Sequence, residues 1–323
     1  MAPDDKRATV IKPKPRTSAR QRPVNLEQAH RAGVRGLARR HPVMTFFVLA
    51  YAISWSWWVP LALRGDVVRA GDGWPTHLPG LVGPAVAAVL VTAAIDGRPG
   101  LRTLARRMVR WRIGVRWWLV VAGTFALVGL GAVQALVTGD DVPALADFTR
   151  YTGVGPIMPL AVVAVVLVVN GLGEETGWRG FAVERLLRDH DLRWTALVVG
   201  TGWAGWHLPF FLLVDTFRSF GPLAVGWFVS MLAASLVLAQ MYVSGQRSIL
   251  LVAAWHTAFN FTSATEATGA VVGTVMSVAL ISWAVWILRH PDATEEPRTP
   301  STSSDPPLAG VMTSGSPTQH EVR

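Results

Sequence analysis

The hydrophobic residues of this chain are concentrated between residues 43 and 290, in stretches long enough to cross a membrane. A spanning helix needs about 20 mostly apolar residues. Eight stretches approach or reach this length: 43–63, 78–96, 115–138, 156–175, 194–214, 220–243, 247–263 and 268–289. The seventh is short and carries His256 and Asn260, so we expect it to be buried among the other helices. The pattern predicts an all-α fold, a polytopic membrane helix bundle of about eight transmembrane helices.

The two ends of the chain differ in composition from this apolar middle. Residues 1–42 are basic and rich in Pro, and residues 291–323 are rich in Pro, Ser, Thr and acidic residues without apolar periodicity. Such segments cannot bury enough apolar surface to fold. We therefore predict a disordered cytoplasmic tail at 1–42, a helix bundle at 43–290 and a second disordered tail at 291–323. Within the first tail, residues 25–40 are compatible with a short amphipathic helix against the membrane.

Composition and charge support a membrane protein and argue against several other classes. The chain is 51% hydrophobic and only 16% charged, whereas soluble domains carry about a quarter charged residues. Of the 30 Lys and Arg, 11 precede the first apolar stretch. This basic segment therefore indicates membrane topology and contact with the lipid bilayer, and no nucleic-acid partner. The absence of Cys excludes disulfides, thiolate metal sites and a cysteine nucleophile.

The distribution of Lys and Arg between the loops predicts the orientation. After the 11 in the N-terminal tail, successive loops hold 2, 7, 1, 4, 1, 1 and 0, and the C-terminal end from Arg289 onward holds 3. The alternation places both termini and the loops 97–116 and 176–193 in the cytoplasm. We predict a multi-pass protein of the plasma membrane whose first span is a retained signal anchor. Glu174 and Glu175 would then lie at the cytoplasmic end of the fourth span, and an active centre there would open towards the cytoplasm or the inner leaflet.

Glu174 and Glu175 are expensive at membrane depth, where charged groups usually serve a task. Side chains of adjacent helical residues point about 100° apart, so the two acids cannot have the same role. Glu175 and Arg179 have the spacing and order of a favourable helical ion pair. We infer that Glu174 faces a catalytic cavity and that Glu175 is held by Arg179. The alternative is an ordinary pair of acids that ends a helix at the membrane interface.

Three more polar residues lie in later apolar stretches. His207 directly precedes Leu208-Pro209, and the proline disrupts a helical hydrogen bond near it. His256 and Asn260 share a helix face one turn apart. They could stabilise an oxyanion, or the imidazole could bind a metal that the carboxamide helps to orient. The alternative is structural hydrogen bonding between helices.

Missing motifs narrow the chemistry further. The chain has no His-Glu-x-x-His zinc motif, no Gly-x-Gly-Asp motif and no Gly-x-Ser-x-Gly elbow. Covalent catalysis by Ser or Cys therefore lacks support. The remaining mechanism is hydrolysis by a water molecule that Glu and His side chains activate.

Three motifs together resemble those of the CPBP family of intramembrane proteases, also called the type II CAAX endopeptidase or ABI family. Its motifs are Glu-Glu-x-x-x-Arg, Phe-x-x-x-His and His-x-x-x-Asn. They match here in the three segments Glu174-Glu175-x-x-x-Arg179, Trp203-x-x-x-His207 and His256-x-x-x-Asn260. The resemblance covers residues 150–265, and it departs from the motif at Trp203, where the family has Phe.

The resemblance implies a fold, an activity and roles for the motif residues. It implies an eight-helix bundle with a cavity open to the cytosolic leaflet, and an endopeptidase whose eukaryotic relatives remove the last three residues of prenylated CAAX proteins. In that picture Glu174 and His207 activate the water. His256 and Asn260 stabilise the oxyanion. Glu175 and Arg179 complete the candidate catalytic set in supporting roles.

The sequence is compatible with more than one cofactor and more than one substrate. Glu174, His207 and His256 could hold one divalent metal such as zinc with an open fourth position, and this ligand set favours the name metalloprotease. The same groups also serve a metal-free mechanism with Glu174 as general base. The expected substrate is a membrane protein or peptide, prenylated or not. The alternative functions are a non-catalytic membrane factor, for bacteriocin immunity or partner binding, and a transporter or proton relay.

Overall fold

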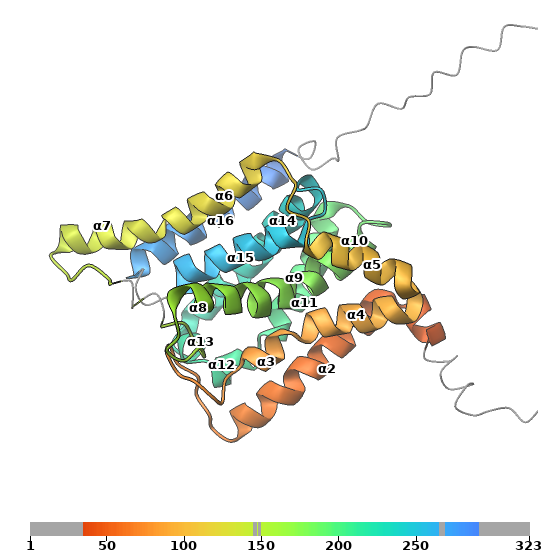
Figure 1. The fold of residues 1–323 in the computed structure, drawn as a ribbon, viewed down its shortest axis with the longest axis horizontal. Helices are drawn as coiled ribbons and strands as arrows, with labels where there is room; N and C mark the ends of the chain where they lie inside the picture. The colour runs from red at the N-terminus through yellow and green to blue at the C-terminus, as the bar shows by residue number, and fades with distance from the viewer. Residues whose placement is uncertain (1–34, 145–146, 148–149, 265–268, 291–323) are drawn as a thin grey trace, which may run out of the picture.

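The structure is a computed structural model of the chain, and it is almost entirely helical (Figure 1). The described residues form no named β-strand and only two isolated β-bridges, between loops. The structure describes residues 35–144, 147, 150–264 and 269–290.

Most of the two predicted disordered tails lies outside the described residues. Only residues 35–42 of the first tail are described, and residues 35–40 are helical. They belong to the range in which the sequence is compatible with a short helix. The tail at 291–323 lies wholly outside.

The membrane-length helices follow the predicted spans closely. Among the described residues, seven helical runs are long and apolar enough to cross a membrane: Pro42–Leu63, Leu78–Ile95, Val115–Thr138, Pro159–Leu186, Leu192–Leu213, Gly221–Ser244 and Val272–Arg289. An eighth apolar helix, Ile249–Thr262, is shorter. The predicted all-α bundle of about eight membrane helices is confirmed.

Several runs consist of more than one helical segment. The segments are α2 (Pro42–Leu63), α3 (Leu78–Leu81), α4 (Gly83–Ile95), α5 (Gly97–Met108), α6 (Val115–Ala126), α7 (Val128–Thr138), α8 (Pro159–Val166), η2 (Leu167–Leu172), α9 (Gly173–Gly177), η3 (Trp178–Val183), α10 (Glu184–Leu186), α11 (Leu192–Trp206), α12 (Phe210–Leu213), α13 (Asp215–Arg218), η4 (Gly221–Leu223), α14 (Ala224–Ser244), α15 (Ile249–Ala264) and α16 (Gly269–Arg289).

The fourth run corrects one expectation from the sequence. The span was expected to end at residue 175, with the two acids at its cytoplasmic end. It instead continues as Pro159–Leu186, so Glu174 and Glu175 lie near its middle. The fall in hydropathy does not end the helix because Glu175 and Arg179 pair with each other and are completely buried.

The fourth run also changes its helical type on both sides of the acids. Segments η2 and η3, which flank α9, are π-helical. A π-helical turn is rare, and it is found frequently at functional sites because it re-aims the side chains of a helix. The predicted directions of Glu174 and Glu175 on an ideal helix are therefore shifted by backbone geometry that the sequence pattern does not reveal.

Two glycines let neighbouring backbones approach the fourth run. A Cβ at Gly177 would lie 2.7 Å from the carbonyl oxygen of Pro84 in α4, and a Cβ at Gly171 would lie 2.7 Å from that of Ala253 in α15. Small residues at such contacts allow close packing of membrane helices. The acids are thereby enclosed between α4 and α15.

The part of the fourth run that carries the acids lies inside the bundle. Figure 1 shows α2 along one edge of the bundle and α6, α7 and α16 along the opposite edge, with α9, α11, α14 and α15 between them. The contacts agree, since α9 packs against α4 and α15, and α16 packs against α7, α14 and α15. The shorter α15 is thus buried among other helices, as its polar residues predict.

The fifth run is interrupted where the sequence places Pro209. Helix α11 ends at Trp206, a turn follows, and α12 begins at Phe210. His207 caps the end of α11 and lies in this turn. The proline therefore ends the helix as expected, because it cannot continue the hydrogen-bond ladder.

Candidate functional site

Glu175 is the most connected acid of the three motifs. Its Oε1 accepts hydrogen bonds from Arg179 Nη1 at 2.9 Å and from His256 Nδ1 at 2.8 Å. The ion pair that the sequence predicts therefore forms, and both of its side chains are completely buried. The bond to His256 was not expected, and it links the first motif to the third.

Glu174 points to a different partner. Trp203 Nε1 donates a hydrogen bond to Glu174 Oε2 over 2.7 Å, and the carboxylate is 2% exposed. No hydrogen bond reaches the other oxygen, Oε1, from any described residue. The two neighbouring acids therefore do different jobs, because Glu175 holds an arginine and a histidine while Glu174 keeps one oxygen available.

Trp203 lies at the centre of the three motifs. The Arg179 guanidinium lies over its ring, with Cζ 4.3 Å from the ring centroid. The His256 ring meets it edge to face at 5.5 Å, and the His207 ring lies 5.9 Å away. This is the position at which the sequence departs from the family motif, and only Trp, not Phe, can donate the bond to Glu174.

Both histidines are held through the same ring nitrogen, Nδ1. His207 Nδ1 donates to the carbonyl oxygen of Trp203 at 2.9 Å, and His256 Nδ1 donates to Glu175. A hydrogen bond at one ring nitrogen fixes the tautomer and leaves the other nitrogen for chemistry. In each ring that other nitrogen is Nε2.

His77 is a histidine that sequence reasoning missed. It is 4% exposed, its ring packs edge to face on Phe210 at 5.2 Å, and Phe210 also contacts the His207 ring at 5.2 Å. Its Nδ1 is buried without a hydrogen-bond partner among the described residues. Burial lowers the pKa of His77 from 6.5 to about 4, so the ring is neutral at pH 7.

Tyr151 is a second missed residue, and it contacts Asn260. The two side chains are hydrogen-bonded, and Tyr151 is 5% exposed. Burial and the nearby charge of Glu174 raise the pKa of Tyr151, so its phenol stays protonated. The residue lies in the loop before the fourth run, where one Tyr in a short polar segment gave no signal in the sequence.

Several buried polar atoms of the site lack partners among the described residues. They are Asn170 Oδ1, Glu175 Oε2, Thr176 Oγ1, Arg179 Nε and Arg179 Nη2. A buried polar atom without a partner costs about 1–3 kcal/mol. Such atoms are typical of sites that receive a ligand or water.

The predicted metal ligands are not gathered into a metal site. Among the described residues, no group of three or more His, Cys, Asp or Glu side chains could hold a metal ion. Glu174 Oε2 is engaged by Trp203, and the described side chains leave His207 Nε2 and His256 Nε2 outside a common coordination sphere with it. We therefore derive no chemical step through a metal, and the zinc site stays a prediction.

The site lies between the middle of the bundle and one of its ends. His77 and Tyr151 reach it from the loops before α3 and before α8. The loops 97–116 and 176–193, which the sequence predicts to be cytoplasmic, lie at the opposite ends of the same runs. The expectation that the centre opens towards the cytoplasm gains no support from this placement.

Comparison with known proteins agrees with the family resemblance. Residues 156–262 match the model of the family described as type II CAAX prenyl endopeptidase Rce1-like. The chain is also 21% identical over 227 residues to a protein of Methanococcus maripaludis named CAAX prenyl protease 2, an alignment that covers 67% of this chain and 80% of that one. The matched region contains the motif residues Glu174, Glu175, Arg179, His207, His256 and Asn260.

Proposed function

We propose, from the Rce1-like type II CAAX prenyl endopeptidase domain at residues 156–262, that this protein is an intramembrane endopeptidase. Its reaction is the hydrolysis of a peptide bond in a membrane-associated substrate by an activated water. The observation that carries the proposal is the pair Glu174–Trp203. One carboxylate oxygen is held by the indole, and the other has no partner among the described residues.

Glu174 acts as the general base in this proposal. Its Oε1 accepts a proton from the water, whose oxygen attacks the carbonyl carbon of the scissile bond. His207 Nε2 orients the same water by accepting its second hydrogen. A positioned general base contributes typically 10²–10⁴-fold to the rate, and the indole bond keeps the carboxylate from turning away.

His256 and Asn260 stabilise the charge that develops on the carbonyl oxygen. The Glu175 carboxylate holds Nδ1–H of His256 and stabilises the protonated ring, as the third member of a catalytic triad does. Protonated Nε2 and the Asn260 carboxamide then donate to the oxyanion. When the C–N bond breaks, the proton held by Glu174 passes to the leaving amine.

Tyr151 and Arg179 support this set without reacting. The hydrogen bond of Tyr151 to Asn260 fixes the orientation of the carboxamide. Arg179 holds Glu175 by its ion pair and packs on Trp203. Glu174, His256 and Asn260 are therefore each held by a neighbour on another element of the fold, whereas His207 is held by the carbonyl of Trp203 on its own helix.

The substrate is a membrane protein or peptide. The name of the Methanococcus relative supports a prenylated substrate as one member of this class. For localisation we propose the plasma membrane with both termini in the cytoplasm, supported by the Lys and Arg distribution. Reporter fusions at the C-terminus, active on only one side of the membrane, would test the orientation.

The deciding experiment compares the membrane peptidomes of cells that carry the wild-type chain, Glu174→Gln or Glu184→Gln at matched abundance. The last variant is the control, because Glu184 is an acid of the same helical run outside the site. We expect new peptide termini in the wild type and in the control that vanish in Glu174→Gln. Identical peptidomes in all three would overturn the protease assignment and favour a non-catalytic membrane factor.

A second measurement addresses the metal. The metal-free reaction predicts that a membrane-permeant chelator leaves the same termini in place. Their loss on chelation, with recovery on added zinc, would support the ligand set Glu174, His207 and His256 instead.

A further inference from the structure

A charged cleft lies at the end of the bundle away from the candidate site. Its volume is about 190 Å³, and it is formed by the end of α4, by α5, by η3 and by α10 with the residues that follow. The polar and charged residues that carry the argument are Asp96, Thr103, Arg107, Glu184, Arg185 and Arg188. None of them belongs to the three motifs.

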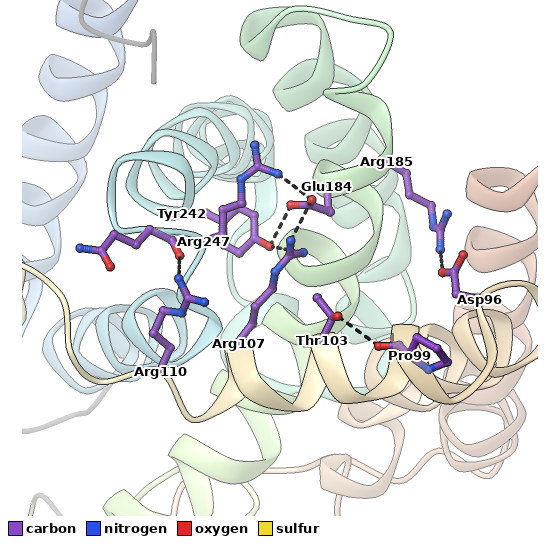
Figure 2. A network of polar contacts seen from close by, with 10 residues as sticks. Asp96, Pro99, Thr103, Arg107, Arg110, Glu184, Arg185, Tyr242 and Arg247 are labelled. Carbon is purple, nitrogen blue, oxygen red and sulfur yellow. Dashed lines mark hydrogen bonds and ion pairs between the residues drawn. The ribbon is translucent and has the colours of Figure 1, made fainter. Parts of the chain in front are cut away.

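The acids of the cleft are already paired. Glu184 Oε1 accepts from Arg107 Nη2 at 3.0 Å and from Arg247 Nη1 at 2.7 Å, and Glu184 Oε2 accepts from Tyr242 at 3.2 Å. Asp96 is paired with Arg185. Figure 2 shows these two groups on opposite sides, with Thr103 on α5 between them.

Positive charge remains after this pairing. Arg107, Arg185 and Arg188 line the cleft together with the two carboxylates Asp96 and Glu184, which leaves a formal excess of one positive charge among the lining residues. An anion is therefore the ligand that the cleft favours. Arginine is the residue best suited to phosphate, because its planar fork of donors matches the phosphate oxygens.

Two of these arginines have donors to spare. The Arg185 side chain is only 10% exposed, and its Nε is buried without a hydrogen-bond partner among the described residues. Arg185 is fixed in place, since its Cζ lies 4.4 Å from the centroid of the Phe181 ring. Arg188 is exposed, and no described side chain pairs with it. A phosphate in the cleft would accept hydrogen bonds from both Arg185 and Arg188.

The position of the cleft indicates where the phosphate comes from. The second run ends at Ile95, directly before Asp96, and the fourth run ends at Leu186, directly after Arg185. The ends of membrane helices lie at the level of the lipid head groups. The adjoining helix α5 also exposes Arg98, Arg102 and Arg106, and such basic surfaces attract anionic lipids.

We propose that this cleft binds the phosphate group of an anionic phospholipid, through Arg185 and Arg188. The lipid would join the ends of the second and fourth runs to α5. This assignment does not depend on the proteolytic activity, because no residue of the cleft takes part in it.

The test is titration of the full-length protein in a neutral detergent with phosphatidylglycerol, read by native mass spectrometry. Phosphatidylcholine, whose head group has no net charge, is the comparison lipid. Two single substitutions remove one positive charge each, Arg188→Gln in the cleft and Arg106→Gln on the exposed face of α5. Because Arg188 is exposed, its variant should fold normally, and a thermal melt without lipid verifies this.

We expect phosphatidylglycerol to bind more tightly than phosphatidylcholine. Arg188→Gln should weaken its binding about tenfold, the effect of one charge-assisted hydrogen bond, and Arg106→Gln less than about twofold. Equal weakening by both variants would overturn the proposal, since it would show only the general attraction of a basic surface. Inorganic phosphate that displaces the lipid at equal concentration would overturn the lipid assignment, because the cleft would then bind the free anion.

Discussion

Two groups of charged residues lie along the same helical run, and they differ in how their polar atoms are used. In the first, Glu175 and Arg179 are both completely buried. In the second, Glu184 pairs with Arg107 and Arg247, whose side chains are 17% and 34% exposed. Both oxygens of Glu184 are hydrogen-bonded. Glu175 receives two partners on one oxygen, while its other oxygen and two nitrogens of Arg179 have none among the described residues.

The difference separates a structural role from a chemical one. A carboxylate whose two oxygens are both hydrogen-bonded, such as Glu184, rigidifies the elements it joins. A buried pair with atoms left over costs stability and is kept where those atoms have a further use. The difference supports the proposed function, in which the reaction takes place around Glu174 and Glu175, while the region around Glu184 joins helix ends.

The largest expected effect is the loss of one member of the buried pair. Arg179→Met should lower the free energy of unfolding by about 3–5 kcal/mol, because it leaves the Glu175 carboxylate buried without its arginine. The measurement is unfolding of the purified protein in detergent. Arg179→Lys, which keeps the charge, should lose less. A loss below about 1 kcal/mol would mean that the pair behaves like a surface ion pair.

The second effect is a pH dependence confined to the site region. His77 has a pKa of about 4 in the folded protein, against an ordinary value of 6.5. Above pH 6.5 the ring is neutral in both states. As the pH falls from 6.5 to 4, the unfolded chain binds a proton that the folded protein does not, so stability falls.

The loss should reach about 3 kcal/mol at pH 4, because one pKa unit corresponds to about 1.4 kcal/mol. The check is to compare thermal midpoints of the wild type and His77→Gln between pH 4 and 7.5. The stability difference between them should change over this interval and level off above pH 6.5. A constant difference would contradict the assignment of the low pKa to His77.

Most of the fold could be predicted from the sequence, because the bilayer requires long apolar helices. The predicted stretches 43–63 and 115–138 agree with the runs Pro42–Leu63 and Val115–Thr138 to within a residue. The fourth run was the exception. Its apolar pattern weakens at Glu174, and only the pairing of Glu175 with Arg179 allows the helix to continue to Leu186.

The candidate site was predicted in its residues but not in its contacts. The spacing of Glu175 and Arg179 was enough to predict their pair, because both lie on one helix. Contacts between helices, such as Glu175 with His256, depend on packing and on the π-helical turns around α9. For the same reason His77 and Tyr151, which come from loops, gave no signal.

The region around Glu184 should show a smaller effect than the buried pair. Glu184→Gln removes the charge that neutralises Arg107 and Arg247, but these side chains are partly exposed and water compensates in part. We expect a loss of about 1–2 kcal/mol in the free energy of unfolding, with proteolysis unchanged at equal amounts of folded protein. Loss of proteolysis in the folded variant would break the division into a structural and a chemical region.

The smallest expected effect is also the one that tests the site most closely. Trp203→Phe introduces the residue of the family motif and keeps an aromatic ring against Arg179 and His256, so the free energy of unfolding should change little. It removes the hydrogen bond to Glu174 Oε2. We expect kcat to fall about tenfold with KM nearly unchanged, because the bond positions the base and does not touch the substrate.

The control for Trp203→Phe is Trp194→Phe, an exposed tryptophan near the start of α11, which should leave kcat unchanged. If Trp203→Phe also keeps full activity, then Glu174 is held by packing alone and the indole bond has no part in the reaction. If kcat falls as expected, this chain orients its base by a donor that the family motif lacks. The departure from the motif at Trp203 would then be part of the chemistry of this protein, since a phenylalanine has no group that can donate to the carboxylate.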